Sequence, residues 1–354
     1  MTMRGPTTDD LAPGAVGLSS AERVLTFEDN QLLSALLGEF DQNLALVEHR
    51  LGVEASARGN HIFISGPADA CIQAETALLA LHDRLKSGHA ISAGDVDGAI
   101  RMAAAEPPVA EPGTPSNLKP VQGVAQIATR QRTITARSPM QDAYIREMEK
   151  SELVFATGPA GTGKTYLAVA FAAAWIERGH ADRIILSRPA VEAGERLGFL
   201  PGAMREKIDP YLRPLYDALY DVMAFERVER GLQSGFIEIA PLAFMRGRTL
   251  SNAVIILDEA QNCSSMQMKM ALTRLGENSR MIVTGDPSQV DLPPGQTSGL
   301  RHAIDLVAEI EGVARLSFTD KDVVRHELVA RIVRAYDEAG RKPNAGGGEA
   351  REDS

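Results

Sequence analysis

The hydrophobic positions of the chain follow two different patterns, which change at about residue 105. Between residues 22 and 100, short segments with strand-like or helix-like spacing predict the order βααββα. In chain order they are strand Val24–Phe27, helix Asn30–Leu37, helix Asn43–Leu51, strand Val53–Ala57, strand His61–Ser65 and a helix from Pro67 to about Leu85. This order predicts a small α+β domain.

From about residue 118 to residue 338, short apolar runs alternate with longer stretches of helical periodicity. The predicted strands are Leu153–Ala156, Arg183–Leu186, Phe236–Ile239, Ala253–Leu257, Met281–Val283 and Val313–Phe318. Apolar strands separated by helices are typical of a parallel sheet with helices on both faces. We therefore expect an α/β domain in this part of the chain.

Four prolines between Pro107 and Pro115 prevent a continuous helix or strand and indicate a linker. The two ends of the chain are rich in small and polar residues and are expected to be disordered. The predicted organisation is a disordered N-terminus at 1–21, the α+β domain at 22–103, a Pro-rich linker at 104–117, the α/β domain at 118–340 and a disordered tail at 341–354.

A complete phosphate-loop pattern, G-x-x-x-x-G-K-[ST], follows the first α/β strand and opens the next helix. Its residues are Gly158, Pro159, Ala160, Gly161, Thr162, Gly163, Lys164 and Thr165. The glycines let backbone N–H groups turn towards phosphates, while Lys164 is expected to reach the β- and γ-phosphates and Thr165 to bind Mg²⁺. A glycine-rich turn without a ligand is the alternative, which the strand–helix context disfavours. The loop therefore predicts ATP and Mg²⁺ as cofactors.

Two adjacent carboxylates, Asp258 and Glu259, end the apolar strand Ala253–Leu257. They fall at the carboxyl edge of the predicted sheet, where such sheets bind ligands. Asp258 is placed to hold Mg²⁺, and Glu259 to orient and deprotonate the attacking water. The two acids could instead cap the next helix, but the P-loop upstream favours hydrolysis. The chain also lacks the Asn-Lys-x-Asp stretch with which small GTPases read guanine.

Four stretches give the chain a resemblance to the PhoH-like family of bacterial ATPases. They are Gly158–Thr165, Ser187–Gly202, Asp258–Asn262 and Thr284–Gln289, and the second is the most specific to the family. The core of this family looks like a single RecA-type domain of superfamily 1 helicases. The resemblance covers about residues 120 to 338 and implies a RecA-like P-loop fold.

The resemblance implies roles for two glutamines. Gln289, after Thr284–Asp286, looks like part of the helicase motif that senses the γ-phosphate, with a tight turn as the alternative. Gln141 is similar to the glutamine that reads the adenine edge in many helicases, with an ordinary surface residue as the alternative.

Arg325 looks like the family's candidate arginine finger, which would stabilise charge at the γ-phosphate. Arg188 and Arg315 compete for that role, and a solvated helix residue is the alternative reading of Arg325. The chain has length for only one RecA-like domain. The resemblance therefore implies that neighbouring subunits complete each site, and we expect a ring, a hexamer.

The βααββα segment resembles a KH domain, which clamps nucleic acid with a GxxG loop. The corresponding turn here, Gly38–Asp41, contains two acids, and residues 22–100 carry twelve Asp or Glu against five Lys or Arg, a net charge of −7. Carboxylates repel phosphates, so a packing or subunit-contact module is favoured over RNA binding.

A better candidate for single-stranded RNA is the stretch Asn117–Gln141, together with the loop Glu192–Gly202. The stretch holds Lys119, Arg130, Arg132 and Arg137 and no acid. Such a local patch could track a nucleic-acid backbone. It could equally be an interdomain strap that pairs with acidic neighbours.

The net charge of −10 means that any surface for nucleic acid must be local. No apolar run is long enough to span a bilayer, there is no secretory signal core, and Cys71 and Cys263 fall in different predicted domains. These features predict a cytoplasmic protein that does not associate with membranes.

Together these features favour an oligomeric, Mg²⁺-dependent ATPase acting on RNA as a helicase or remodeller. The resemblance also implies an endoribonuclease partner. An ATP-dependent switch or scaffold and a P-loop kinase remain alternatives, and Glu259 disfavours the kinase.

Overall fold

The fold is that of a computed structural model, which describes residues 20–105, 124–189, 204–293 and 295–324, together with residues 329 and 332. Of residues 204–211 it describes the backbone alone. The chain separates into two compact units, residues 1–113 and residues 114–354. Most of the predicted Pro-rich linker and the whole predicted tail lie outside the described residues.

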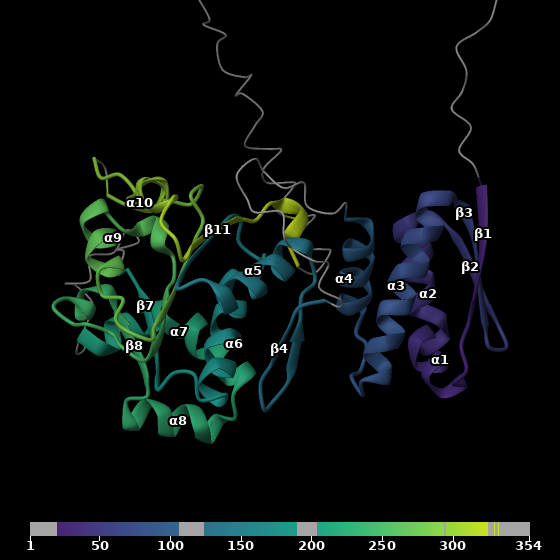
Figure 1. Ribbon diagram of the computed structural model, residues 1–354, viewed down its shortest axis with the longest axis horizontal. Coiled ribbons are helices and arrows are strands. Elements are labelled where there is room, and N and C mark those ends of the chain that lie inside the picture. Colours follow the sequence, from purple (N-terminus) through teal and green to yellow (C-terminus); the bar gives the residue numbers. More distant parts are fainter. Residues whose placement is uncertain are drawn as a thin grey trace, which may run out of the picture. The chain divides into compact units, whose positions relative to one another are not determined.

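In the first unit, helices pack on a three-stranded antiparallel sheet with the strand order β1-β3-β2 (Figure 1). The strands are β1 (Ser20–Thr26), β2 (Glu54–Arg58) and β3 (His61–Pro67). The helices are α1 (Asn30–Leu37), α2 (Gln42–Leu51), α3 (Ala68–Lys86) and α4 (Ala93–Ala104), with the 3₁₀ turn η1 (Glu39–Asp41) between α1 and α2. The α+β class and the order βααββα are as predicted, whereas the KH likeness stays a prediction.

Helix α4 is an element that the sequence pattern did not predict. It begins after Ser92, whose side chain and that of Asp95 form a reciprocal capping box. Val96 and Ile100, one helical turn apart, are buried in the core of this unit. The helix was missed because its apolar positions are mostly alanines, which give a weak periodic signal.

The second unit is built on a six-stranded sheet, in which every pairing is parallel and the strand order is β11-β6-β10-β9-β7-β8. The strands are β6 (Leu153–Thr157), β7 (Arg183–Arg188), β8 (Ile237–Pro241), β9 (Ala253–Leu257), β10 (Arg280–Gly285) and β11 (Val313–Ser317). All six strand predictions, and the parallel sheet that they implied, are confirmed.

Alternate side chains of the central strands pack into two separate cores. In β9, for example, Val254 and Ile256 face the core formed with α5 (Pro139–Lys150), α6 (Lys164–Glu177), α7 (Met204–Val222) and α8 (Phe225–Ser234). Ile255 and Leu257 face the core formed with α9 (Ser265–Leu272) and α10 (Leu300–Val307). Figure 1 shows these helices on opposite sides of the sheet. An α/β arrangement with both faces covered follows.

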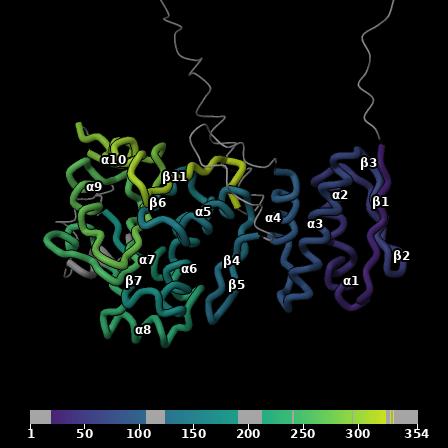
Figure 2. The backbone as a smooth tube through the Cα atoms, viewed as in Figure 1, coloured from purple at the N-terminus to yellow at the C-terminus, as the bar shows by residue number. Residues whose placement is uncertain are grey.

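The basic stretch before the P-loop contains a hairpin that was not predicted. Strands β4 (Gln126–Ala128) and β5 (Thr133–Thr135) pair antiparallel, as Figure 2 shows. The strands are only three residues long, too short for an alternating pattern to stand out.

No helix among the described residues is long and apolar enough to cross a bilayer.

Candidate nucleotide site

The P-loop connects the end of β6 to the start of α6. Gly158, Gly161 and Gly163 have φ values of 135°, 84° and 83°, which side chains rarely adopt. A Cβ atom on Gly158 would lie 2.3 Å from the carbonyl oxygen of Phe318, so the backbone approach there requires glycine. Because α6 begins at Lys164, the positive end of its dipole lies at the loop.

The ammonium group of Lys164 lies inside this loop. Its Nζ donates to the carbonyl oxygens of Gly158 and Pro159, both at 2.7 Å, and to the hydroxyl of Thr162 at 3.1 Å. The side chain is buried. A cation enclosed by a glycine-rich turn suits a phosphate group, which would offer stronger acceptors than the loop carbonyls.

Two hydroxyl groups converge on one carboxylate oxygen at the carboxyl edge of the sheet. Thr165 Oγ1 donates to Asp258 Oδ1 at 2.7 Å, and Thr284 Oγ1 donates to the same oxygen at 2.6 Å. Asp258 is buried, with 4% of its surface exposed. The three residues come from α6, from the end of β9 and from β10, so the parallel register brings them together.

Glu259 has a left-handed backbone conformation, with φ 53° and ψ 38°. Its Oε1 pairs with Arg188 at 2.9 Å, and its Oε2 accepts from Gln261 Nε2 at 2.5 Å. It makes no side-chain capping bond to the 3₁₀ turn η4 (Ala260–Asn262) that follows. The capping alternative for this carboxylate therefore fails.

Gln261 extends this network to the predicted γ-phosphate sensor. Its Oε1 accepts from the backbone N–H of Asp286 at 3.0 Å, and Asp286 Oδ2 accepts from Gln289 Nε2 at 2.8 Å. Gln289 itself is exposed. The structure thus links the segment after β10 to Glu259, a connection that spacing along the sequence does not reveal.

Gln141 is buried beneath the P-loop rather than exposed on the surface. Its Oε1 accepts from the backbone N–H of Arg137 at 2.8 Å, and its Nε2 donates to the carbonyl of Thr162 at 3.0 Å. Both ends of the amide therefore brace the chain around the loop. Reading of adenine by Gln141 stays a prediction and would require exchange of one of these bonds.

Two buried groups at the site were not singled out from the sequence. The hydroxyl of Tyr144 donates to the carbonyl of Lys164 at 3.3 Å, and burial, with a contribution from the charge of Asp258, raises the pKa of Tyr144 well above its usual value. The buried Ser187 Oγ has no hydrogen-bond partner among the described residues, although the Ser187 carbonyl accepts from the backbone N–H of Asp258. Tyr144 lies outside the four motif stretches, whereas Ser187 begins the stretch Ser187–Gly202 but was given no role of its own.

The P-loop threonine and the two carboxylates line a cavity of about 490 Å³. Its remaining lining residues come mainly from α6, from α7 and from the end of β7, and the whole set is Thr165, Tyr166, Arg188, Pro214, Asp217, Ala218, Asp221, Asp258 and Glu259. Burial and a hydrogen bond to Asp221 raise the pKa of Tyr166 to about 12, so this phenol stays protonated.

The donor atoms at this site fit Mg²⁺ with a nucleotide. A hydroxyl and a carboxylate, 2.7 Å apart, are the hard oxygen ligands that Mg²⁺ prefers. Among the described residues, no group of three or more His, Cys, Asp or Glu could hold a metal ion alone. Mg²⁺ in nucleotide enzymes binds through one or two protein ligands, substrate phosphates and water, so Thr165 and Asp258 could serve as its protein ligands.

The three candidate arginine fingers are in different positions. Arg188 lines the cavity and pairs with Glu259 of its own subunit. Arg315 is exposed on β11 and is not part of the cavity lining. Arg325 lies outside the described residues, as does the loop Glu192–Gly202.

The basic stretch is partly engaged with acidic neighbours. Arg132 pairs with Asp221 of α7, and the backbone N–H of Arg130 donates to Glu177 at 2.7 Å. Lys119 lies outside the described residues. Both contacts lie within the second unit, so the interdomain strap and RNA binding both stay predictions.

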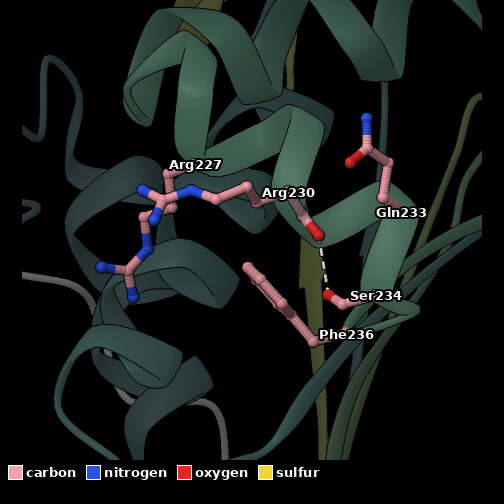
Figure 3. Close-up of a pocket in the computed structure, with 5 residues that line it drawn as sticks. All are labelled: Arg227, Arg230, Gln233, Ser234 and Phe236. Carbon is pink, nitrogen blue, oxygen red and sulfur yellow. Dashed lines mark hydrogen bonds between the residues drawn. The ribbon is translucent and has the colours of Figure 1, made fainter.

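A second hollow, of about 630 Å³, lies where α8 leads into β8, at the amino end of the sheet (Figure 3). Arg227, Arg230, Gln233, Ser234 and Phe236 line it. Figure 3 shows both arginine side chains extending to the same side, and Ser234 Oγ donating to the carbonyl of Arg230 at 2.7 Å. It shares no residue with the P-loop, which lies at the carboxyl end of the strands.

Comparison with known proteins settles the family. Residues 133–337 match the family described as PhoH-like protein. This range contains the P-loop, both carboxylates and the segment after β10. The chain belongs to the PhoH-like family. A PhoH-like protein of Bacillus subtilis is 47% identical over 307 residues, which cover 86% of this chain and 93% of that protein. A PhoH-like protein of Mycobacterium tuberculosis is 46% identical over 308 residues, which cover 86% and 85%.

The similarity to Protein PhoH of Escherichia coli is narrower. It is 47% identical over 216 residues, which cover 60% of this chain and 61% of that protein. Together, the family, the P-loop and the parallel sheet identify this PhoH-like chain as a P-loop NTPase.

Proposed function

We propose that this PhoH-like protein hydrolyses ATP in the presence of Mg²⁺. The observation that carries the proposal is the meeting of Thr165 and Asp258 at 2.7 Å, with Glu259 beside them in the same cavity. A metal-binding hydroxyl, a metal-binding carboxylate and a candidate base then surround one place where a γ-phosphate could lie.

Each residue has a distinct part in this reaction. Lys164 would exchange its loop carbonyls for β- and γ-phosphate oxygens, and Thr165 and Asp258 would hold the metal. When bound, Mg²⁺ would connect phosphate oxygens to the chain and neutralise part of their charge. Glu259 would accept a proton from a water whose oxygen attacks the γ-phosphorus, while the bond to the bridging oxygen breaks and ADP leaves.

The test is release of phosphate from ATP, measured with and without Mg²⁺ and on the Glu259→Gln variant. We expect turnover that requires Mg²⁺ and that falls about a hundredfold or more in the variant, the scale of losing a general base. Transfer of the phosphoryl group to an acceptor other than water would identify a kinase. Binding of ATP without turnover would identify a switch or scaffold.

We also propose a ring, in which a neighbouring subunit supplies Arg325 to the γ-phosphate. The family resemblance supports this proposal, because one RecA-like domain leaves a site that a neighbour could complete. Arg325→Ala and Lys164→Ala proteins, each inactive alone, should recover part of the activity when they assemble together. If rings shown to contain both variants recover no activity, then Arg325 acts within its own subunit or is not the arginine finger.

Single-stranded RNA is the polymer that we propose as effector, with helicase or remodelling activity and an endoribonuclease partner as the family resemblance implies. The exposed Arg130 on the β4–β5 hairpin supports a contact with a nucleic-acid backbone. Stimulation of phosphate release by single-stranded RNA is the expected result. Equal rates with and without RNA would oppose it.

A further inference from the structure

The carboxylate of Glu259 is engaged at both of its oxygens. A guanidinium from the end of β7, that of Arg188, holds Oε1, and the amide of Gln261 holds Oε2. These two contacts fix the direction in which the carboxylate faces, so Glu259 must release at least one of them before it can turn towards a water elsewhere in the cavity. The arrangement is therefore one in which the base is held back from hydrolysis.

The left-handed backbone of Glu259 supports the idea that these partners matter. A non-glycine residue in this conformation is strained, and it persists where its surroundings fix it. Here the surroundings are two side-chain bonds to the same carboxylate. When one of them is released, the position of the carboxylate is free to change.

Arg188 is also the residue best placed to respond to ATP. Four of the residues that line the cavity are acidic, namely Asp217, Asp221, Asp258 and Glu259, and Arg188 is the one cation among the described lining residues. A triphosphate that enters beside Thr165 brings oxygens that compete with Glu259 for this guanidinium. Phosphate accepts the planar fork of an arginine as well as a carboxylate does.

We propose that Arg188 is a positioning residue that senses the γ-phosphate and controls Glu259. Without nucleotide, or with ADP, Arg188 holds the Glu259 carboxylate. With ATP, it transfers to the γ-phosphate oxygens and frees Glu259 to engage the attacking water. This inference rests on the proposed ATPase function, and it assigns to Arg188 a role within its own subunit.

A double-mutant cycle on nucleotide affinity tests the proposal without relying on turnover. The full-length chain, with Mg²⁺, is titrated with a non-hydrolysable ATP analogue and with ADP. For Arg188→Ala we expect the affinity for the analogue to fall about tenfold or more, the scale of a lost charged hydrogen bond, with ADP affinity changed less than about twofold. Arg188→Lys keeps the charge but loses the planar fork of donors, so its affinity for the analogue should lie between those of the wild type and Arg188→Ala.

The second side of the cycle removes the residue that holds Arg188. Glu259→Ala should raise the affinity for the analogue by about three- to tenfold, because Arg188 no longer has to leave a partner. This gain should disappear in the double variant. Arg183→Ala is the matched control, since Arg183 lies on the same strand but donates to the carbonyl of Ser251. It should leave both affinities unchanged.

Two results would overturn the proposal. Equal losses of analogue and ADP affinity in Arg188→Ala would make the pair a fixed structural contact. A gain from Glu259→Ala that persists without Arg188 would mean that simple removal of a negative charge explains it. Failure of the ATPase proposal is a separate outcome: the wild type would then bind the analogue but release no phosphate, and the affinity cycle would still decide the role of Arg188.

Discussion

Each unit of the chain has a loop that begins with a glycine and that a motif relates to phosphate binding. The P-loop, Gly158–Thr165, encloses the ammonium of Lys164. The turn Gly38–Asp41 of the first unit contains Glu39 and Asp41, and its Phe40 is fully exposed at 102%. Glycine at positive φ is common to both, at 135° for Gly158 and 76° for Gly38. The difference between the two loops is in charge and in hydrogen bonding.

The two regions also differ in how they hold non-glycine residues with a left-handed backbone. Next to the P-loop, Glu259 at φ 53° has side-chain bonds to Arg188 and Gln261. In the other loop, Phe40 at φ 53° has its ring in solvent, and Asp41 at φ 58° makes no side-chain capping bond. The P-loop therefore offers a phosphate a cation and fixed polar partners, whereas the turn Gly38–Asp41 offers two carboxylates, and we expect phosphate to bind only at the first.

The largest expected effect is at Lys164. Lys164→Ala should weaken ATP binding strongly and abolish turnover, because the loop loses the cation that faces the β- and γ-phosphates. Titration with fluorescent ATP and an assay of phosphate release measure the two effects. Lys150→Ala, on the surface of α5 where it pairs with Glu147, is the control and should behave like the wild type. If Lys164→Ala turned over ATP at the wild-type rate, the enclosed cation would not be what distinguishes the P-loop from the turn Gly38–Asp41.

The next effect separates the two carboxylates. Glu259→Gln should keep ATP binding near normal and slow hydrolysis at least about a hundredfold, because the amide cannot take the proton. Asp258→Asn should instead weaken Mg²⁺-dependent binding, since Asp258 is bound by the hydroxyls of Thr165 and Thr284 at the metal position. If both variants lose Mg²⁺-dependent binding alike, this division of roles is wrong.

The sequence predicted the strands of the second unit better than the contacts between its side chains. The four central strands β6, β7, β9 and β10 follow from apolar runs, because they are buried on both faces. The edge strands β8 and β11 gave a weaker signal, since Glu238 and Arg315 interrupt them. The contact of Arg188 with Glu259 could not be predicted, since it depends on β7 and β9 being neighbours in the sheet. The hairpin β4–β5 and helix α4 were missed because three-residue strands and alanine-rich positions give little periodicity.

A smaller effect concerns RNA. Replacing Arg130, Arg132 and Arg137 together by Ala should weaken binding of single-stranded RNA and flatten its salt dependence by up to about three units of slope. Glu39→Gln combined with Asp41→Asn should change RNA affinity by less than about threefold, because we expect this loop not to touch RNA. Filter binding over a series of salt concentrations measures both.

A matched control for the triple variant is Asp221→Asn, which releases Arg132 from its ion pair and leaves the arginine in place. It should not weaken RNA binding. If RNA binding survives the triple variant and responds to the acidic loop instead, the first unit is the RNA reader and the KH likeness gains support.

The smallest effect tests the unsupported strain at Phe40. Phe40→Asn should stabilise the first unit by about 0.5–1 kcal/mol, because asparagine tolerates the left-handed region better than an aromatic residue, and the exposed ring has no packing to lose. Calorimetric unfolding of the full chain measures the change in the transition of this unit. Phe63→Asn on β3, where the backbone is that of a strand, is the control and should bring no gain.

The same substitution next to the P-loop should act in the opposite direction. In Glu259→Asn the shorter side chain also relieves left-handed strain, but it gives up the bonds to Arg188 and Gln261, so we expect no gain or a net loss of stability. A gain at Glu259 equal to that at Phe40 would mean that the two partners contribute nothing to holding this backbone. A loss of stability in Phe40→Asn would show that the exposed ring has a partner, and the acidic loop would then be a docking surface rather than an unused clamp.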